Sequence, residues 1–116
     1  MTGEITRAVQ FIEMNYTREI NASDAATLTG YSYHHFIRKF RAEVGRTFYD
    51  VIVELRIKHA CRLLKESSLD MPAICERSGF NSQVQFYRMF KRRVGVTPMQ
   101  YRIAYYLQPS EEGEAC

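Results

Sequence analysis

The apolar positions of this chain recur at helical spacing along most of its length. Residues 4–16 place apolar side chains on one stripe and charged side chains outside it, which predicts an amphipathic helix. A longer stretch keeps the same period from Phe48 to about Glu66, roughly 19 residues, and would form a helix of ~28 Å. Shorter stretches of the same kind lie between and after these two. The pattern predicts an all-α fold of about seven helices.

Residues that favour helix ends punctuate this pattern. Asn21 and Asp24 have the spacing of a capping box, in which two side chains each bond the other's backbone N–H. Gly30 and Gly79 each follow a short helical stretch and can adopt the left-handed conformation that closes a helix. The predicted N-caps are Asn21, Ser32, Thr47, Asp70, Ser82 and Thr97. Twice, two short helices are separated by a tight turn, which predicts two helix-turn-helix units.

These boundaries divide the chain into four segments. We expect a first helix-turn-helix subdomain over residues 1–46 and a linker helix over residues 47–66. A second helix-turn-helix subdomain follows over residues 67–107, and residues 108–116 form a polar tail. A linker helix of this length can hold two subdomains at a fixed distance, which matters because successive major grooves on one face of B-DNA lie ~34 Å apart.

The second half of the chain repeats part of the first. At offsets of 49 and 50 the repeat pairs Gly30 with Gly79, Phe36 with Phe86, Arg38 with Arg88, Phe40 with Phe90, Arg41 with Lys91, Gly45 with Gly95 and Thr47 with Thr97. Core packing explains the repeated phenylalanines, and turn geometry explains the repeated glycines. Neither requires an exposed arginine to recur, so the repeat favours a binding surface present twice.

Composition and charge narrow the class of partner. Hydrophobic residues make up 46% and charged residues 25% of the chain, so it should fold. The formal charge is +3, but three glutamates lie in the tail, and residues 1–110 carry 16 basic and 10 acidic side chains, a net of +6. A basic patch favours a polyanionic partner, although such a patch is more often simply a solvated face. No apolar run approaches the ~20 residues of a membrane span and no secretion signal is evident, so we expect a cytoplasmic protein without a membrane partner.

The residues suited to catalysis or metal binding are not grouped as such chemistry requires. Cys61, Cys75 and Cys116 show no C-x-x-C spacing, and we expect reduced thiols, with the first two packed in the core. His34 and His35 are adjacent on a predicted helix and therefore point in different directions. There is no His-Glu-x-x-His motif and no glycine-rich phosphate loop. We expect no enzymatic activity, no bound metal and no cofactor.

One family shares the order and spacing of many of these residues. The matching positions are Arg56, Ala60, Leu63, Leu64, Ile74, Gly79, Phe80, Phe86, Arg88, Phe90, Lys91, Gly95, Thr97, Pro98, Tyr101 and Arg102. Over about residues 4–105 the chain resembles the DNA-binding domain of the AraC/XylS family of bacterial transcription regulators. The resemblance implies two helix-turn-helix units that set their second helices into adjacent major-groove segments of double-stranded DNA. It also implies association with the nucleoid.

The resemblance further implies which residues contact DNA. Base-reading positions of the family fall on Tyr33, His34, Ile37, Arg38, Gln83, Val84, Tyr87 and Arg88. Positions suited to phosphate contacts fall on Lys39, Arg41, Lys91 and Arg92. Because the two reading helices differ in sequence, the DNA site should be non-palindromic. We expect the isolated domain to be monomeric, whereas a protein that also carries the family's dimerising domain would be a dimer.

Three points stay open at the level of sequence. Val84 replaces the small polar residue common in the family, which puts one base contact in doubt. Arg56 has two candidate roles, contact with DNA or bonding between the linker and the subdomains, and we favour the second. The alternative function is a protein-interaction module that contacts RNA polymerase and binds DNA weakly or non-specifically.

Overall fold

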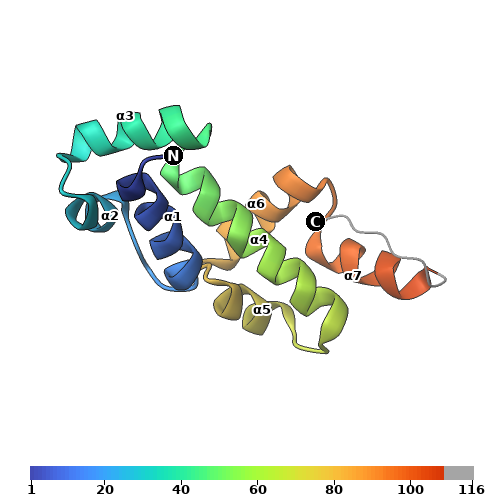
Figure 1. Ribbon diagram of the computed structural model, residues 1–116. Helices are drawn as coiled ribbons and strands as arrows, with labels where there is room; N and C mark the ends of the chain where they lie inside the picture. The colour runs from blue at the N-terminus through green and yellow to red at the C-terminus, as the bar shows by residue number, and fades with distance from the viewer. Residues whose placement is uncertain (109–116) are drawn as a thin grey trace. The chain divides into compact units, whose positions relative to one another are not determined.

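The computed structural model describes residues 1–108, and those residues form seven α-helices and no strand, which confirms the predicted all-α class (Figure 1). The helices are α1 (Gly3–Asn15), α2 (Ala22–Thr29), α3 (Tyr33–Val44), α4 (Phe48–Glu66), α5 (Met71–Ser78), α6 (Gln83–Val94) and α7 (Pro98–Leu107). The chain divides into two compact units, the first ending at Leu55 and the second beginning at Arg56. The division falls inside α4, so each unit takes one half of that helix.

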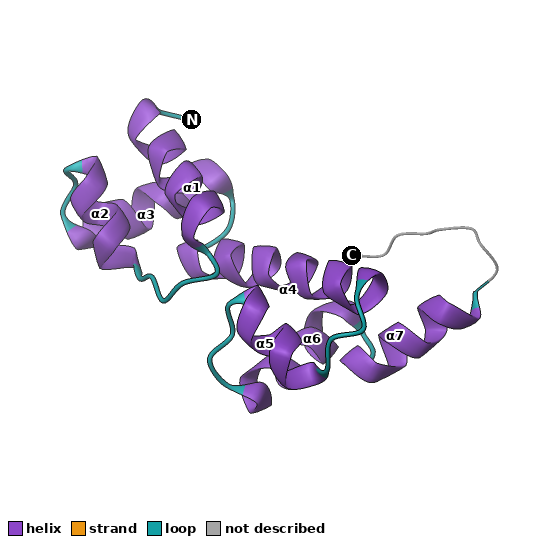
Figure 2. Cartoon of the chain, turned by 90° about the horizontal axis from the view of Figure 1, so that it is seen from below, coloured by secondary structure: helices purple, strands orange, loops and turns teal. Residues whose placement is uncertain are grey.

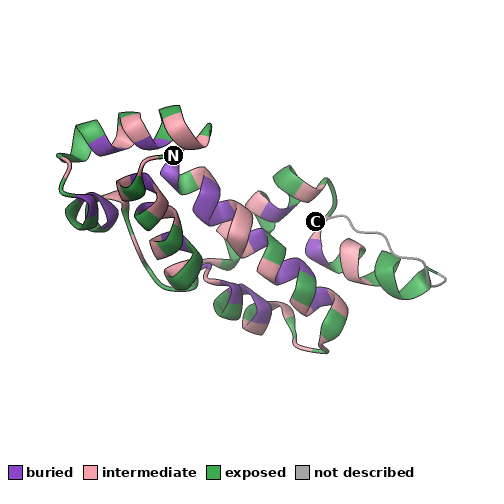
Figure 3. Ribbon diagram, viewed as in Figure 1, coloured by how far each residue is buried: buried purple, intermediate pink, exposed green. Residues whose placement is uncertain are grey.

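The first unit packs α1, α2, α3 and the start of α4 around an aromatic centre. The ring centroids of Phe36 and Phe40 lie 5.6 Å apart, and each lies within 5.8 Å of the Phe48 ring. Ile5 and Ile12 of α1 are fully buried beside them. Figure 3 shows that these helices are buried on one face and exposed on another.

The second unit has a core of the same kind, built from the rest of α4 with α5, α6 and α7 (Figure 2). Phe86 and Phe90 of α6 are fully buried, with ring centroids 5.9 Å apart. The Phe80 ring lies 5.3 Å from the Phe86 ring, and the Tyr101 ring of α7 lies 5.7 Å from the Phe90 ring. The phenylalanines predicted to face the core therefore do so in both units.

The helix ends follow the predicted capping. Asn21 with Asp24 and Thr97 with Gln100 form complete capping boxes, and the Ser32 and Ser82 hydroxyls accept the backbone N–H groups of residues 35 and 85. One cap was missed, because Thr2 accepts the N–H of residue 5 and starts α1 one residue earlier than predicted.

The internal repeat extends further than residues 30–47 and 79–98. At an offset of 52, Ile5, Ala8 and Ile12 of α1 correspond to Ile57, Ala60 and Leu64 of α4, and all six side chains are buried. At an offset of 50, the start of α4 corresponds to the start of α7. Thus α4 serves as the last helix of the first unit and the first helix of the second.

One contact of the second unit has no counterpart in the first. The Arg102 guanidinium donates hydrogen bonds to the carbonyl oxygens of Leu64 at 3.0 Å, Ser67 at 3.0 Å and Leu69 at 2.8 Å, with a longer one to Leu63 at 3.5 Å. It thereby satisfies the Leu64 carbonyl in the last turn of α4 and two carbonyls of the segment after that helix. The corresponding residue of the first unit is Ile52, which is buried and apolar.

The structure tests the predicted packing of two of the cysteines. Cys61 and Cys75 are both buried, as expected of packed side chains. Cys75 is a free thiol, as expected. Cys116 and most of the predicted polar tail lie outside the described residues.

Among residues 1–108 no helix is long and apolar enough to cross a membrane.

Candidate nucleic-acid interface

Each unit contains a short helix, a tight turn and a second helix, α2 to α3 in the first and α5 to α6 in the second. The turn glycines Gly30 and Gly79 have φ values of 80° and 105°, a region that side chains other than hydrogen rarely tolerate. Just before each glycine a buried hydroxyl, of Thr29 or Ser78, donates to a carbonyl one turn earlier in the helix. The two turns are therefore built alike, and each fixes the direction in which the second helix leaves.

The predicted base-reading residues of α3 do not all reach the surface equally. Tyr33 is 47% exposed, and His34 and Arg38 are also exposed. Ile37 is only partly exposed, because it packs against the core of the first unit. The Tyr33 and His34 rings touch edge to face, with centroids 5.3 Å apart. This face therefore offers aromatic and hydrogen-bonding groups at its start and one arginine a turn later.

The predicted base-reading residues of α6 are all exposed. Val84 is 66% and Tyr87 40% exposed, and Gln83 and Arg88 are exposed as well. Gln83 is the first residue of α6 and Arg88 lies beyond its first turn, so the two polar side chains stand at different heights along the helix. The Tyr87 ring lies 5.5 Å from the buried Phe86 ring, whereas Val84 is the more exposed of these two side chains.

The predicted phosphate-binding residues differ between the two helices. Arg41, Lys91 and Arg92 are exposed, and within residues 1–108 they form no ion pair. Lys39 is instead paired with Glu43, at 2.9 Å between Nζ and a carboxylate oxygen. Overall α3 carries three cations and one carboxylate, whereas α6 carries four cations and no carboxylate.

Two residues relevant to this surface were missed at the sequence level. Glu43 lies four positions after Lys39, a spacing that brings side chains together on a helix and could have revealed the pair. Arg93 occupies the position in α6 that Glu43 occupies in α3, and it is exposed. Comparing the charges of the two repeats position by position would have shown this reversal.

The exposed basic helices find a counterpart in known proteins. A protein family described as a helix-turn-helix domain matches residues 25–104, more than half of the chain. The multiple antibiotic resistance protein MarA of Salmonella typhimurium is 32% identical over 95 residues, which is 82% of this chain and 75% of MarA. The chain belongs to the AraC/XylS family. The resemblance inferred from its motifs is thereby confirmed.

Other relatives are named as transcriptional regulators, and some are much longer than the matched region. The HTH-type transcriptional regulator GlxA of Rhizobium meliloti is 37% identical over 91 residues, 78% of this chain but 28% of GlxA. Among solved structures, the C-terminal domain of the response regulator AraT from Geobacillus stearothermophilus matches with a TM-score of 0.85 and 27% identity, covering 97% of this chain and 93% of that one. The DNA-binding domain of AdpA, solved in complex with a target DNA, gives a TM-score of 0.83 and 26% identity over 90% and 94% of the two chains.

Arg56, whose role the family signature left open, lies beside an aromatic ring of the second unit. Its guanidinium carbon is 6.0 Å from the centroid of the buried Phe80 ring. Such a cation–π contact supports the structural role that we favoured. Within the described residues no cluster of His, Cys, Asp or Glu side chains is placed to hold a metal ion.

Proposed function

We propose that this domain binds double-stranded DNA sequence-specifically, by placing α3 and α6 in adjacent segments of the major groove, and thereby regulates bacterial transcription. The observation that carries the proposal is the exposed basic face that recurs on both helices, each held by a turn of the same construction. The relatives named as transcriptional regulators and the DNA complex of the similar AdpA domain support it. We assign the domain no catalytic role and place its action at the nucleoid, in the cytoplasm.

The chemistry of the exposed side chains suggests a division of labour. Arg38 and Arg88 can each bond one guanine through two hydrogen bonds, and Gln83 can bond adenine in the same way. Val84 and Ile37 offer apolar contact, of the kind that a thymine methyl group accepts. We therefore propose that α6 discriminates between bases through more polar contacts than α3.

The remaining cations are suited to positioning. Arg41, Lys91 and Arg92 stand past the middle of their helices and are exposed. Contacts with phosphate fix the register of a protein on DNA and add affinity that falls with salt, without carrying sequence information. The RNA polymerase alternative has less support, because the cations exposed on both helices and the DNA complex of the similar AdpA domain favour DNA as the partner.

Selection from a pool of random duplexes tests the proposal. We expect two unequal sequence motifs about one helical turn apart, ~10 base pairs, because two different helices read neighbouring grooves. A single motif, or two inverted copies of one motif, would contradict it. Failure of the folded domain to bind any duplex at low salt would favour the alternative.

The division between reading and positioning residues can be tested on the selected site. Arg88→Ala should cost ~1–3 kcal/mol on that site and flatten the preference at one base position. Lys91→Ala, on the same helix, is the matched control and should weaken binding to all sequences about equally. Affinities of both variants for the selected site and for a scrambled duplex decide the matter. Equal losses on both duplexes for both variants would overturn the assignment.

A further inference from the structure

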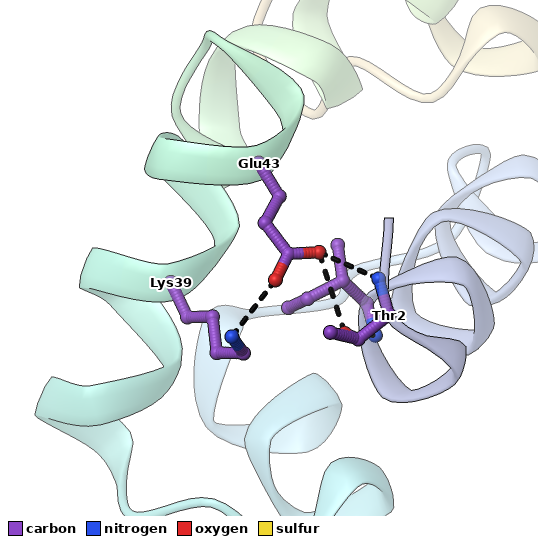
Figure 4. A network of polar contacts seen from close by, with 4 residues as sticks. Thr2, Lys39 and Glu43 are labelled. Atoms are coloured by element: carbon purple, nitrogen blue, oxygen red, sulfur yellow. Dashed lines mark hydrogen bonds and ion pairs between the residues drawn. The ribbon is translucent and has the colours of Figure 1, made fainter.

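A network of polar contacts ties the DNA-facing helix of the first unit to the start of the chain. Figure 4 shows Lys39 and Glu43 one turn apart on α3, with the Glu43 carboxylate turned toward Thr2. Oε1 of Glu43 accepts hydrogen bonds from the Thr2 backbone N–H at 2.8 Å and from the Thr2 hydroxyl at 3.3 Å. Oε2 of Glu43 accepts from the Lys39 ammonium at 2.9 Å. Both oxygens of Glu43 are therefore engaged.

These contacts hold the carboxylate in place. Thr2 is the N-cap of α1, so Glu43 lies at the positive end of that helix, where a negative charge is favoured. The bonds from Lys39 and Thr2 lower the pKa of Glu43, and the Glu43 carboxylate raises the pKa of Lys39. Both groups thus stay charged around neutral pH, and the lysine faces an anion that cannot easily swing away.

The second unit lacks this arrangement. At the offset of 50, Lys39 corresponds to Met89 and Glu43 corresponds to Arg93. The repeat keeps the exposed arginine at Arg38 and Arg88, yet reverses the sign of the charge at the position of Glu43. Packing does not explain the reversal, because the residue at this position is not buried in either unit.

We propose that Glu43 limits the DNA affinity of the first unit by occupying Lys39, so that its ammonium contacts the protein's own carboxylate in place of a DNA phosphate. The inference rests on the proposed DNA binding and corrects one assignment within it. Lys39 is a phosphate contact only when Glu43 is removed or neutralised. The first unit then depends on Arg38 and Arg41, while the second unit supplies most of the electrostatic affinity.

Glu43→Gln tests the inference with little change of shape. The glutamine keeps an oxygen that can accept both bonds from Thr2, but it carries no charge to hold Lys39. We expect tighter binding to any duplex, by about three- to tenfold at 0.1 M salt, and a salt dependence steeper by ~0.9, the value of one phosphate contact. Glu13→Gln, which removes an exposed carboxylate of α1, controls for the change in net charge and should alter affinity much less.

A double-mutant cycle separates this mechanism from simple repulsion between Glu43 and DNA. Lys39→Met introduces the residue that the second unit carries at the same position, and in that background Glu43→Gln should have almost no effect. An equal gain with and without Lys39 would overturn the inference, as would no gain from Glu43→Gln in a variant with an unchanged melting temperature. Absence of duplex binding by the unaltered domain would instead overturn the proposed DNA binding itself. The failure of the inference and the failure of the proposed function therefore give different results.

Discussion

The two units of this chain share a scaffold and differ in the surface that it carries. Buried positions recur from α1 to α4 and from α3 to α6, and the turn glycines and capping serines recur with them. Positions outside the fully buried core have diverged, with Val84 for His34, Tyr87 for Ile37 and Arg93 for Glu43. A duplicated fold can thus keep its core while each copy acquires its own binding face.

The two units also attach their final helices differently. The final helix of the first unit, α4, continues into the second unit. The final helix of the second unit, α7, ends at Leu107. The second unit packs Tyr101 of its final helix against Phe90 and adds Arg102, which bonds the Leu64 carbonyl of α4 and two carbonyls just after α4. The same position in the first unit is the buried Ile52. Polar bonds in one copy and apolar packing in the other solve the same problem of attaching a helix.

The largest effects should come from the shared core. Phe36→Ala and Phe86→Ala each remove a fully buried ring from equivalent places, and each should cost ~3–5 kcal/mol of unfolding free energy. Urea unfolding followed by circular dichroism measures the loss, and hydrogen exchange locates it in one unit or the other. The exposed Val84→Ala serves as control and should stay within ~0.5 kcal/mol. A small loss for one phenylalanine alone would show that the two cores are not equivalent.

A smaller effect is expected from the contact that only the second unit has. Arg102→Ala removes the hydrogen bonds to the last turn of α4 and to the segment after it, and should lower the free energy of unfolding by ~1.5–3 kcal/mol. Arg102→Lys keeps the charge, but a single ammonium group cannot reach all of these carbonyls, so it should recover less than half of the loss. Full recovery by lysine would mean that charge, and not the shape of the guanidinium, matters here.

The smallest effect concerns pH. Burial and then the nearby Arg62 lower the pKa of His59 in the second unit from its ordinary 6.5. The folded state therefore binds a proton at His59 less readily than the unfolded chain does. The contribution of neutral His59 to the free energy of unfolding is complete above pH 6.5 and is lost as the pH falls below 6.5. Glu43 of the first unit, whose pKa lies below its ordinary 4.5, loses its contribution only as pH falls below that value.

Melting temperatures measured across this range sharpen the comparison. His59→Gln should flatten the decline between pH 7.5 and 5.5, whereas Glu43→Gln should change only the decline below about pH 4.5. A decline near pH 6 that persists unchanged in His59→Gln would exclude His59 as its source.

Local signals in the sequence were sufficient for most of the fold. Capping residues such as Asn21 and Ser82 act within one turn, and the spacing of Phe36 and Phe40 already fixes which face is buried. Thr2 was missed as a cap because the apolar stripe begins only at Ile5. The bonds of Arg102 join residues more than thirty positions apart, which no local pattern shows.

The candidate site was predictable in outline and less so in its charges. Exposure of His34, Arg38 and Arg88 followed from their place opposite the buried phenylalanines, whereas Gln83 is exposed as the first residue of α6. Whether a lysine is available to a partner depends on what else lies beside it. The position of Lys39 in the sequence suggested a phosphate contact, but the fold brings Glu43 and the start of α1 against it.

The most direct test of the unequal roles of α3 and α6 is the salt dependence of duplex binding by two charge-neutralised variants. Lys91→Gln with Arg92→Gln should reduce the slope of log affinity against log salt by ~1.8, for two lost phosphate contacts. Lys39→Gln with Arg41→Gln should reduce it by only ~0.9, because Lys39 is held by Glu43. Equal reductions, or a larger one for the α3 variant, would contradict the account.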